Sequence, residues 1–225
     1  MGWNDWIRTV EVEPSLYAAD FARLGDQLET LLRAGARIFH FDIGDAHFVE
    51  PVTIGPIVLE SIAPLVHREG GVIDCHLMVD DPAHHFAALE AGGADSITFH
   101  FEAADDPSGL AEQARAHGFQ VGLAFNPETA VEDVAPLAEA FDLVLCMSIH
   151  PGYSGQEFMS DALGRLEQLR SLIPEGVHVQ VDGGITFDNI RSVYDAGADL
   201  IVAGSAIFHR EDLPRAYRRL VQELA

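Results

Sequence analysis

A recurring junction between helix and strand constrains this chain more than any other feature of its sequence. A helical stretch ends in Ala-Gly-Ala or a close variant, and a short run of β-forming residues follows at once, in residues 32–42, 90–100 and 195–203. Glycine adopts the left-handed conformation that ends helices without a steric penalty, so each copy predicts a helix that stops and leads into a strand. Such a junction is typical of a repeated strand–helix unit.

Apolar runs bounded by turn residues extend this repeat over the whole chain. They predict eight strands with helices between them, and 225 residues then give about 28 per unit. The runs are nearly continuous rather than alternating, which is typical of parallel strands covered on both faces. We expect one α/β domain over residues 1–225, a closed (β/α)8 TIM barrel. The predicted strands lie near residues 10–17, 37–42, 72–78, 95–100, 119–124, 141–148, 177–182 and 199–203.

An open, doubly wound sheet is the alternative architecture. A nucleotide-binding version would carry G-x-G-x-x-G after its first strand, and residues 13–20 contain no glycine. The closed barrel is therefore the favoured prediction.

The charged residues exclude several functions. All 13 cationic side chains are arginine, so Schiff-base aldolases, pyridoxal-phosphate enzymes and lysine-containing phosphate loops are excluded. The formal net charge of −23 argues against a nucleic-acid partner, because such binding depends on a basic face.

The apolar residues bear on membrane association and on the cellular compartment. No apolar run reaches the roughly 18 residues of a membrane span, so we expect no membrane partner. Cys75 and Cys146 each lie inside an apolar run and not in a metal-binding or disulfide pattern. We therefore expect buried thiols and a cytoplasmic protein.

Four side chains at predicted strand ends suggest a metal site. His40 and Asp42 are two residues apart and point to the same face of their strand, while His76 and Asp182 lie at the ends of two others. If these ends converge at the barrel mouth, they supply two nitrogen and two oxygen ligands for a divalent ion. The alternative is that the histidines are hydrogen-bonded interior residues and that each aspartate caps the following loop.

Glycine-rich turns indicate a phosphate site independently of the metal ligands. They lie in residues 151–156, 182–185 and 203–208, after the last three predicted strands, where barrels commonly hold a phosphate on backbone N–H groups. With no lysine in the chain, we expect amides and dipoles to hold the phosphate.

Seven motifs follow one another over nearly the whole chain. They are Ser15-Leu-Tyr-Ala-Ala-Asp-Phe21, His40-Phe-Asp-Ile-Gly-Asp-Ala-His-Phe48, Thr53-Ile-Gly-Pro56, His76-Leu-Met78, Met147-Ser-Ile-His-Pro-Gly-Tyr-Ser-Gly-Gln156, Val181-Asp-Gly-Gly-Ile185 and Ala203-Gly-Ser-Ala-Ile-Phe208. In this order they resemble the ribulose-phosphate 3-epimerase family. That family is a (β/α)8 barrel, usually homo-oligomeric, that interconverts D-ribulose 5-phosphate and D-xylulose 5-phosphate with a divalent metal ion.

The resemblance assigns roles to matching positions. It implies that His40, Asp42, His76 and Asp182 hold one divalent ion, with zinc expected first and Fe(II), manganese or cobalt as alternatives. Asp42 and Asp182 become the catalytic pair, because inversion at C3 removes a proton on one face and returns one on the other. The expected substrate contacts are Ser15, His76, Met78, Met147, Gly152, Tyr153, Ser154, Gly155, Gly183, Gly184, Gly204 and Ser205.

Departures from the family pattern leave the identity of the sugar substrate open. They are concentrated at the expected pocket: Tyr17, Gly44, Ala46, His150 and Ser154 differ from the usual residues. Gly44 replaces a usual methionine, which predicts extra space near the reacting carbons, and His150 adds a titratable donor near the substrate loop. The alternatives are a paralogue that epimerises another ketose phosphate, such as D-allulose 6-phosphate, or a catalytically silent barrel that binds a sugar phosphate.

Some residues keep a structural alternative or no assigned function. Met78 and Met147 are expected either to line the pocket or to fill the core. His47 and His100 match family positions and are expected to have structural roles. Trp3 and Trp6 precede the resemblance, and we expect a plug over the bottom of the barrel or an interface contact.

Overall fold

Eight parallel strands run through the computed structural model, which describes residues 2–224. The strands are β1 (Glu11–Pro14), β2 (Ile38–Gly44), β3 (Val72–Met78), β4 (Ser96–His100), β5 (Gln120–Phe125), β6 (Leu143–Met147), β7 (His178–Asp182) and β8 (Leu200–Ala203). The α-helices are α1 (Trp3–Trp6), α2 (Leu24–Ala34), α3 (Pro56–Arg68), α4 (Phe86–Gly92), α5 (Pro107–Ala116), α6 (Val131–Val134), α7 (Ala162–Leu172), α8 (Ile190–Asp195), α9 (Ser205–Phe208) and α10 (Leu213–Glu223). Short 3₁₀ helices cover Leu16–Ala18, Phe21–Arg23, Pro82–His85, Phe101–Ala103 and Ala135–Ala140.

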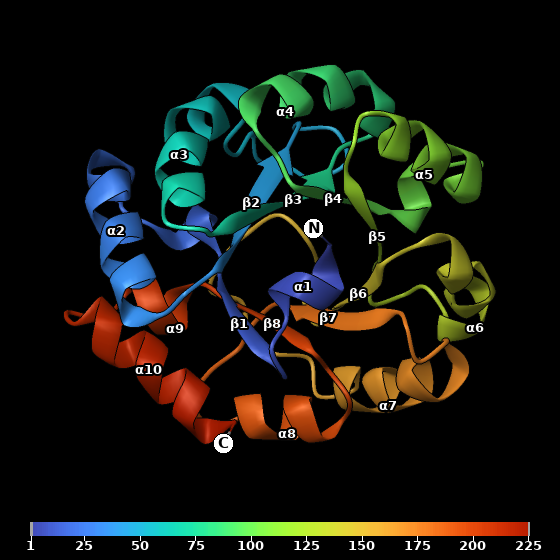
Figure 1. Ribbon diagram of the computed structural model, residues 1–225. Helices are drawn as coiled ribbons and strands as arrows, with labels where there is room; N and C mark the ends of the chain where they lie inside the picture. The colour runs from blue at the N-terminus through green and yellow to red at the C-terminus, as the bar shows by residue number, and fades with distance from the viewer. Residues whose placement is uncertain (1, 225) are drawn as a thin grey trace.

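The strands form a ring, which confirms the predicted barrel. Each strand from β2 to β8 pairs in parallel with the next one along the chain, and β8 pairs with β1. A single parallel bridge between Ser15 and His40 joins β1 to β2 and completes the ring. The helices surround this ring on the outside (Figure 1).

The recurring glycines end helices as expected. Gly35 follows α2 with φ +110° and Gly93 follows α4 with φ +88°, both in the left-handed region. On α2, Leu24, Leu28 and Leu31 are buried against the barrel, so its apolar face follows the helical period.

The predicted strand positions are confirmed, with two differences near the future site. The first strand ends at Pro14, three residues early, because Ser15 begins a turn into the 3₁₀ helix Leu16–Ala18. The second strand continues to Gly44, two residues further than expected, because it pairs with β3 as far as Met78.

Helix α1 closes the N-terminal end of the barrel, as the plug alternative predicts. It lies across the opening of the ring (Figure 1). Trp3 is 2% exposed and packs in one cluster with Ile38, Leu143 and Leu200 from the strands, while Trp6 packs edge-on against it. The lower interior of the barrel is therefore filled with apolar side chains.

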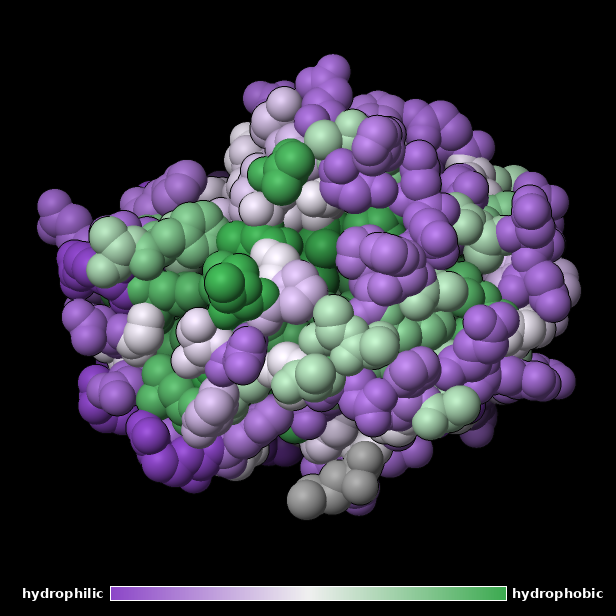
Figure 2. Space-filling view, turned by 90° about the horizontal axis from the view of Figure 1, so that it is seen from above, coloured by the Kyte–Doolittle hydropathy of each residue, from purple (hydrophilic) through white to green (hydrophobic). Residues whose placement is uncertain are grey.

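On the side where α3 and α4 lie, hydrophilic side chains surround hydrophobic ones that gather across the middle of the view (Figure 2). Ile57, at the start of α3, is 78% exposed. Within residues 2–224, no helix combines the length and apolarity that crossing a bilayer requires.

Candidate active site and metal centre

The four expected metal ligands meet at the C-terminal end of the barrel. The His40 Nε2 atom lies 3.3 Å from Asp42 Oδ1 and 3.3 Å from His76 Nδ1, and His76 Nδ1 lies 3.3 Å from Asp42 Oδ1. Asp182 Oδ2 lies 3.9 Å from each of the two histidine nitrogens. The convergence that the sequence left open is therefore present in the fold.

This cluster fits a divalent ion. Ligand atoms about 2.0 to 2.2 Å from a tetrahedral ion are about 3.3 to 3.6 Å apart, close to the separations found. Two imidazoles and two carboxylates suit zinc as well as iron, manganese and cobalt. All four side chains are buried or nearly so, with Asp182 the most exposed at 17%.

The two aspartates differ in their surroundings. Burial alone would raise the pKa of Asp42, but the charge and hydrogen bond of His40, the largest opposing effects, hold this pKa well below its usual range. Asp42 Oδ2 also accepts a 2.7 Å hydrogen bond from Ser15 Oγ. Burial and the neighbouring Asp42 charge raise the pKa of Asp182 to about 7. Without a metal ion, the pair therefore holds one ionised and one readily protonated carboxyl group.

A second polar layer, which we did not predict, lies beneath the cluster. His40 Nδ1 lies 3.4 Å from Asp74 Oδ2 and 3.7 Å from Glu13 Oε2, and the Gln180 amide donates to both carboxylates at 2.9 Å. All four side chains are fully buried. Burial foremost raises the pKa of Glu13 to about 7, despite its hydrogen bond with His40. Asp74 precedes His76 by two residues, the same spacing as His40 and Asp42, and that signal could have indicated it.

The other histidine of the cluster, His76, has its own outer partners. His76 Nε2 lies 2.8 Å from His100 Nε2, and His100 Nδ1 lies 3.3 Å from Glu102 Oε2. Glu102 Oε1 accepts hydrogen bonds from the Asn126 N–H, at 2.8 Å, and from the Thr129 hydroxyl. Sequence reasoning assigned His100 a structural role and did not single out Glu102.

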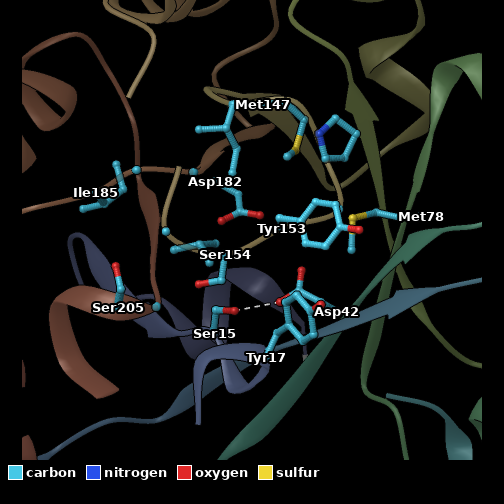
Figure 3. Close-up of a pocket in the computed structure, with 18 residues that line it drawn as sticks. Ser15, Tyr17, Asp42, Met78, Met147, Tyr153, Ser154, Asp182, Ile185 and Ser205 are labelled. Carbon is cyan, nitrogen blue, oxygen red and sulfur yellow. Dashed lines mark hydrogen bonds between the residues drawn. The ribbon is translucent and has the colours of Figure 1, made fainter. Parts of the chain in front are cut away.

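A pocket opens above the cluster, and Asp42 and Asp182 point into it from opposite sides (Figure 3). Every expected substrate contact lines it except His76, which lies fully buried below. Both methionines line the pocket, as does Tyr17. Neither arginine nor lysine is among the described residues that form its wall. The predicted contacts in the wall are Ser15, Met78, Met147, Gly152, Tyr153, Ser154, Gly155, Gly183, Gly184, Gly204 and Ser205.

One expectation about the departures is wrong. Gly44 opens no space, because a Cβ there would lie 2.8 Å from Val49 Cγ2 and 3.0 Å from the Pro51 oxygen. The loop after β2 fills that volume. His150 lies beside the loop that lines the pocket, as expected, but outside the pocket wall, and it pairs with Glu128 Oε1 at 3.1 Å. Of the departures, Tyr17 and Ser154 contact the pocket.

A family model described as the ribulose-phosphate 3 epimerase family matches residues 11–208, which is most of the barrel. The chain belongs to this family. Its members are isomerases that act on carbohydrates. Curated relatives named ribulose-phosphate 3-epimerase include one from Schizosaccharomyces pombe, 39% identical over 89% of this chain and 88% of its own length. Another, from Escherichia coli K12, is 39% identical over 95% of this chain and 96% of its own length.

Solved structures agree on the fold of this family member. The 3-hexulose-6-phosphate synthase from Salmonella typhimurium aligns with a TM-score of 0.70 at 17% identity, covering 95% of this chain and 98% of its own. The KGPDC structure from Streptococcus mutans gives a TM-score of 0.71 at 13% identity, covering 96% and 98%. Identities this low support the barrel architecture alone.

Proposed function

We propose that this protein is a ketose-phosphate 3-epimerase that interconverts D-ribulose 5-phosphate and D-xylulose 5-phosphate. The observation that carries the proposal is the pair of aspartates, which face one another across the pocket and belong, with His40 and His76, to a cluster that could hold a metal ion. A binding protein needs no such acid–base pair. Relatives named for this reaction cover most of the chain and support the choice of sugar.

The proton transfers follow from the position of the carboxylates. In the ring, β1 and β8 separate β2 from β7, so Asp42 and Asp182 flank a substrate that lies between them. The ketone at C2 acidifies the proton on C3. One carboxylate removes this proton, and the other, as a carboxylic acid, returns a proton to the opposite face of the same carbon. The configuration at C3 inverts, and the two groups exchange protonation states.

The environments of the two aspartates suit such an exchange. Asp42 is held ionised by Ser15 and His40, whereas Asp182 has fewer partners and takes up a proton more readily. Environments that push two carboxyl pKa values apart are a common way to assign acid and base. The buried position of both groups also limits proton exchange with water during a turnover.

The divalent ion would be held by His40, Asp42, His76 and Asp182, and zinc is our first choice. When bound, it supplies positive charge that stabilises the enediolate formed on loss of the C3 proton. The same two imidazoles and two carboxylates could hold iron, manganese or cobalt in place of zinc.

The phosphate end of the substrate would lie against the loops after β6, β7 and β8. Figure 3 shows Ser154 and Ser205 on one side of the pocket, away from Met78, and Gly184 and Gly204 of the same loops also line it. Backbone N–H groups and hydroxyls bind phosphate without a basic side chain. A local cradle of this kind works on a protein of charge −23, because repulsion from distant charges is screened beyond about 8 to 10 Å.

We further propose a homo-oligomer, as the family resemblance implies. Phe21 and Ile57 are 48% and 78% exposed and line one surface groove between α2 and α3, which gives a second copy an apolar face. Sedimentation equilibrium of the purified protein tests this, since a monomeric mass would refute it.

Proton NMR in D₂O tests the proposed reaction. With metal-loaded protein, D-ribulose 5-phosphate should give D-xylulose 5-phosphate that carries deuterium at C3. D-Allulose 6-phosphate serves as the competing substrate, and faster exchange on that sugar would assign the protein to the paralogue. No exchange on either sugar would support the silent binding barrel and refute the epimerase.

A further inference from the structure

His76 contacts His100, a histidine that lies outside both the four-residue cluster and the pocket wall. His76 offers Nδ1 to the cluster and turns Nε2 toward His100. A neutral imidazole has one protonated nitrogen and one bare nitrogen. For Nδ1 to bind a metal ion, the single proton of His76 must therefore lie on Nε2.

The contact between the two rings links their tautomers. The two Nε2 atoms are 2.8 Å apart, and a hydrogen bond at this distance needs one proton between them. If His76 donates it, His100 Nε2 must be bare, and the proton of His100 must lie on Nδ1. If His100 donates it, His76 carries its proton on Nδ1 and cannot bind the ion.

Glu102 decides between these two states. Its Oε2 lies 3.3 Å from His100 Nδ1, and an ionised carboxylate can only accept there. Burial would raise the pKa of Glu102, but its hydrogen bonds to His100, Thr129 and the Asn126 backbone lower it to about 2, so it is ionised at neutral pH. When its Nδ1 donates to this carboxylate, a neutral His100 leaves its Nε2 bare and able to accept from His76.

Packing keeps the chain of hydrogen bonds in place. His76 and His100 are both fully buried, and the Phe48 ring lies 4.7 Å from the His100 ring, centroid to centroid. Glu102 Oε1 is held by the Asn126 N–H, so Oε2 alone faces His100.

We propose that Glu102, acting through His100, is a positioning residue that fixes His76 in the tautomer whose Nδ1 binds the metal ion. The inference rests on the metal site of the proposed function, and its test uses no sugar. Outer-shell carboxylates that orient ligating histidines through a direct hydrogen bond typically change metal affinity 10- to 100-fold when removed. Here the carboxylate acts through an intervening imidazole.

Glu102→Gln is the informative substitution. The Asn126 N–H keeps the amide oxygen, so the amide NH₂ group turns toward His100 and donates to Nδ1. His100 then carries its proton on Nε2, His76 is forced to carry its proton on Nδ1, and the site is blocked. Asp105→Asn is the matched control, because it removes one negative charge from the same loop at an exposed position.

Long-range ¹H–¹⁵N correlation spectra of histidine-labelled protein read the tautomers directly, before and after zinc is added. The wild type should show His76 protonated on Nε2 and His100 on Nδ1, and Glu102→Gln should reverse both in the metal-free protein. Chelator competition should give zinc binding about 10- to 100-fold weaker for Glu102→Gln and unchanged for Asp105→Asn.

The second part of the test repeats Glu102→Gln in a His100→Gln background. A glutamine at this position can present its amide oxygen to His76 Nε2 without help from Glu102. Adding Glu102→Gln to His100→Gln should therefore leave zinc affinity unchanged. A wild-type His76 protonated on Nδ1, or equal effects of Glu102→Gln in both backgrounds, would overturn the proposal. These results stand whether or not the protein epimerises a sugar, so failure of the two proposals is distinguishable.

Discussion

The two ends of this barrel are built from the same eight strands and carry opposite chemistry. At the N-terminal end, Trp3 packs on Ile38, Leu143 and Leu200, all buried and apolar. At the other end, histidines and aspartates of β2, β3 and β7 converge below an open pocket. In such barrels, residues at strand C-termini carry function and those at the N-terminal face carry stability. Buried polar side chains are thus tolerated at the C-terminal end, where they form the candidate site.

Removal of the metal ion should give the largest difference between the two ends, because it should abolish activity at the C-terminal end and leave the N-terminal end unchanged. We expect a chelator to stop C3 proton exchange and added zinc, manganese or cobalt to restore it. Both tryptophans of the chain, Trp3 and Trp6, lie in the N-terminal plug, so tryptophan fluorescence reports that end alone and should stay unchanged. Exchange that persists in protein shown to be metal-free would refute the role given to the ion.

Trp3→Ala should produce the reverse pattern. Truncating a buried tryptophan to alanine typically costs about 3 to 5 kcal/mol of unfolding free energy, through lost burial and a cavity. At 25 °C, kcat should stay within about twofold of the wild type, provided the variant is folded. Trp6→Ala, at a half-buried position, should cost less. Urea unfolding measures both, and a large loss of kcat in folded Trp3→Ala would show that the ends are coupled.

Glu13→Gln should change how stability depends on pH in the metal-free protein. Burial raises the folded pKa of Glu13 to about 7, above its ordinary value of 4.5. Between these values the folded state holds a proton that the unfolded state lacks, so the wild type loses stability as pH rises. The variant should gain up to about 3 kcal/mol relative to the wild type between pH 4.5 and pH 8. An equal difference at both pH values would contradict this assignment.

Tyr153→Phe should have the smallest effect, because it removes one exposed contact at the pocket mouth. The Tyr153 hydroxyl lies 3.2 Å from Glu50 Oε2 and joins two loops. Losing a net hydrogen bond of about 0.5 to 1 kcal/mol should lower the unfolding free energy by no more than that amount, and the loosened loops should raise KM by at most about two- to fivefold, with kcat nearly unchanged. Steady-state kinetics would contradict this if kcat fell tenfold.

The sequence predicted the repeat and the ligand set for related physical reasons. Helix stops at Gly35 and Gly93 and continuous apolar strands are local signals, readable without the fold. His40 and Asp42 share a face through the two-residue period of a strand. Their approach to Asp182 depends on ring closure, which the count of eight strands implied.

What the sequence did not reveal depends on contacts across the ring. Glu13 and Gln180 meet Asp74 only because β1, β3 and β7 turn these side chains inward at one level. The space around Gly44 is set by the backbone path of the following loop, and no local pattern predicts that path. Glu102 reaches the metal site only through a second imidazole, which composition and spacing do not show.

The central claim is that Asp42 and Asp182 serve opposite faces of one carbon. Asp42→Asn and Asp182→Asn, each confirmed to hold metal, can be incubated in D₂O with ribulose 5-phosphate and separately with xylulose 5-phosphate. We predict that each variant exchanges the C3 proton of a different epimer and that neither interconverts them. Exchange of the same epimer by both variants, or continued epimerisation by either one, would contradict the account.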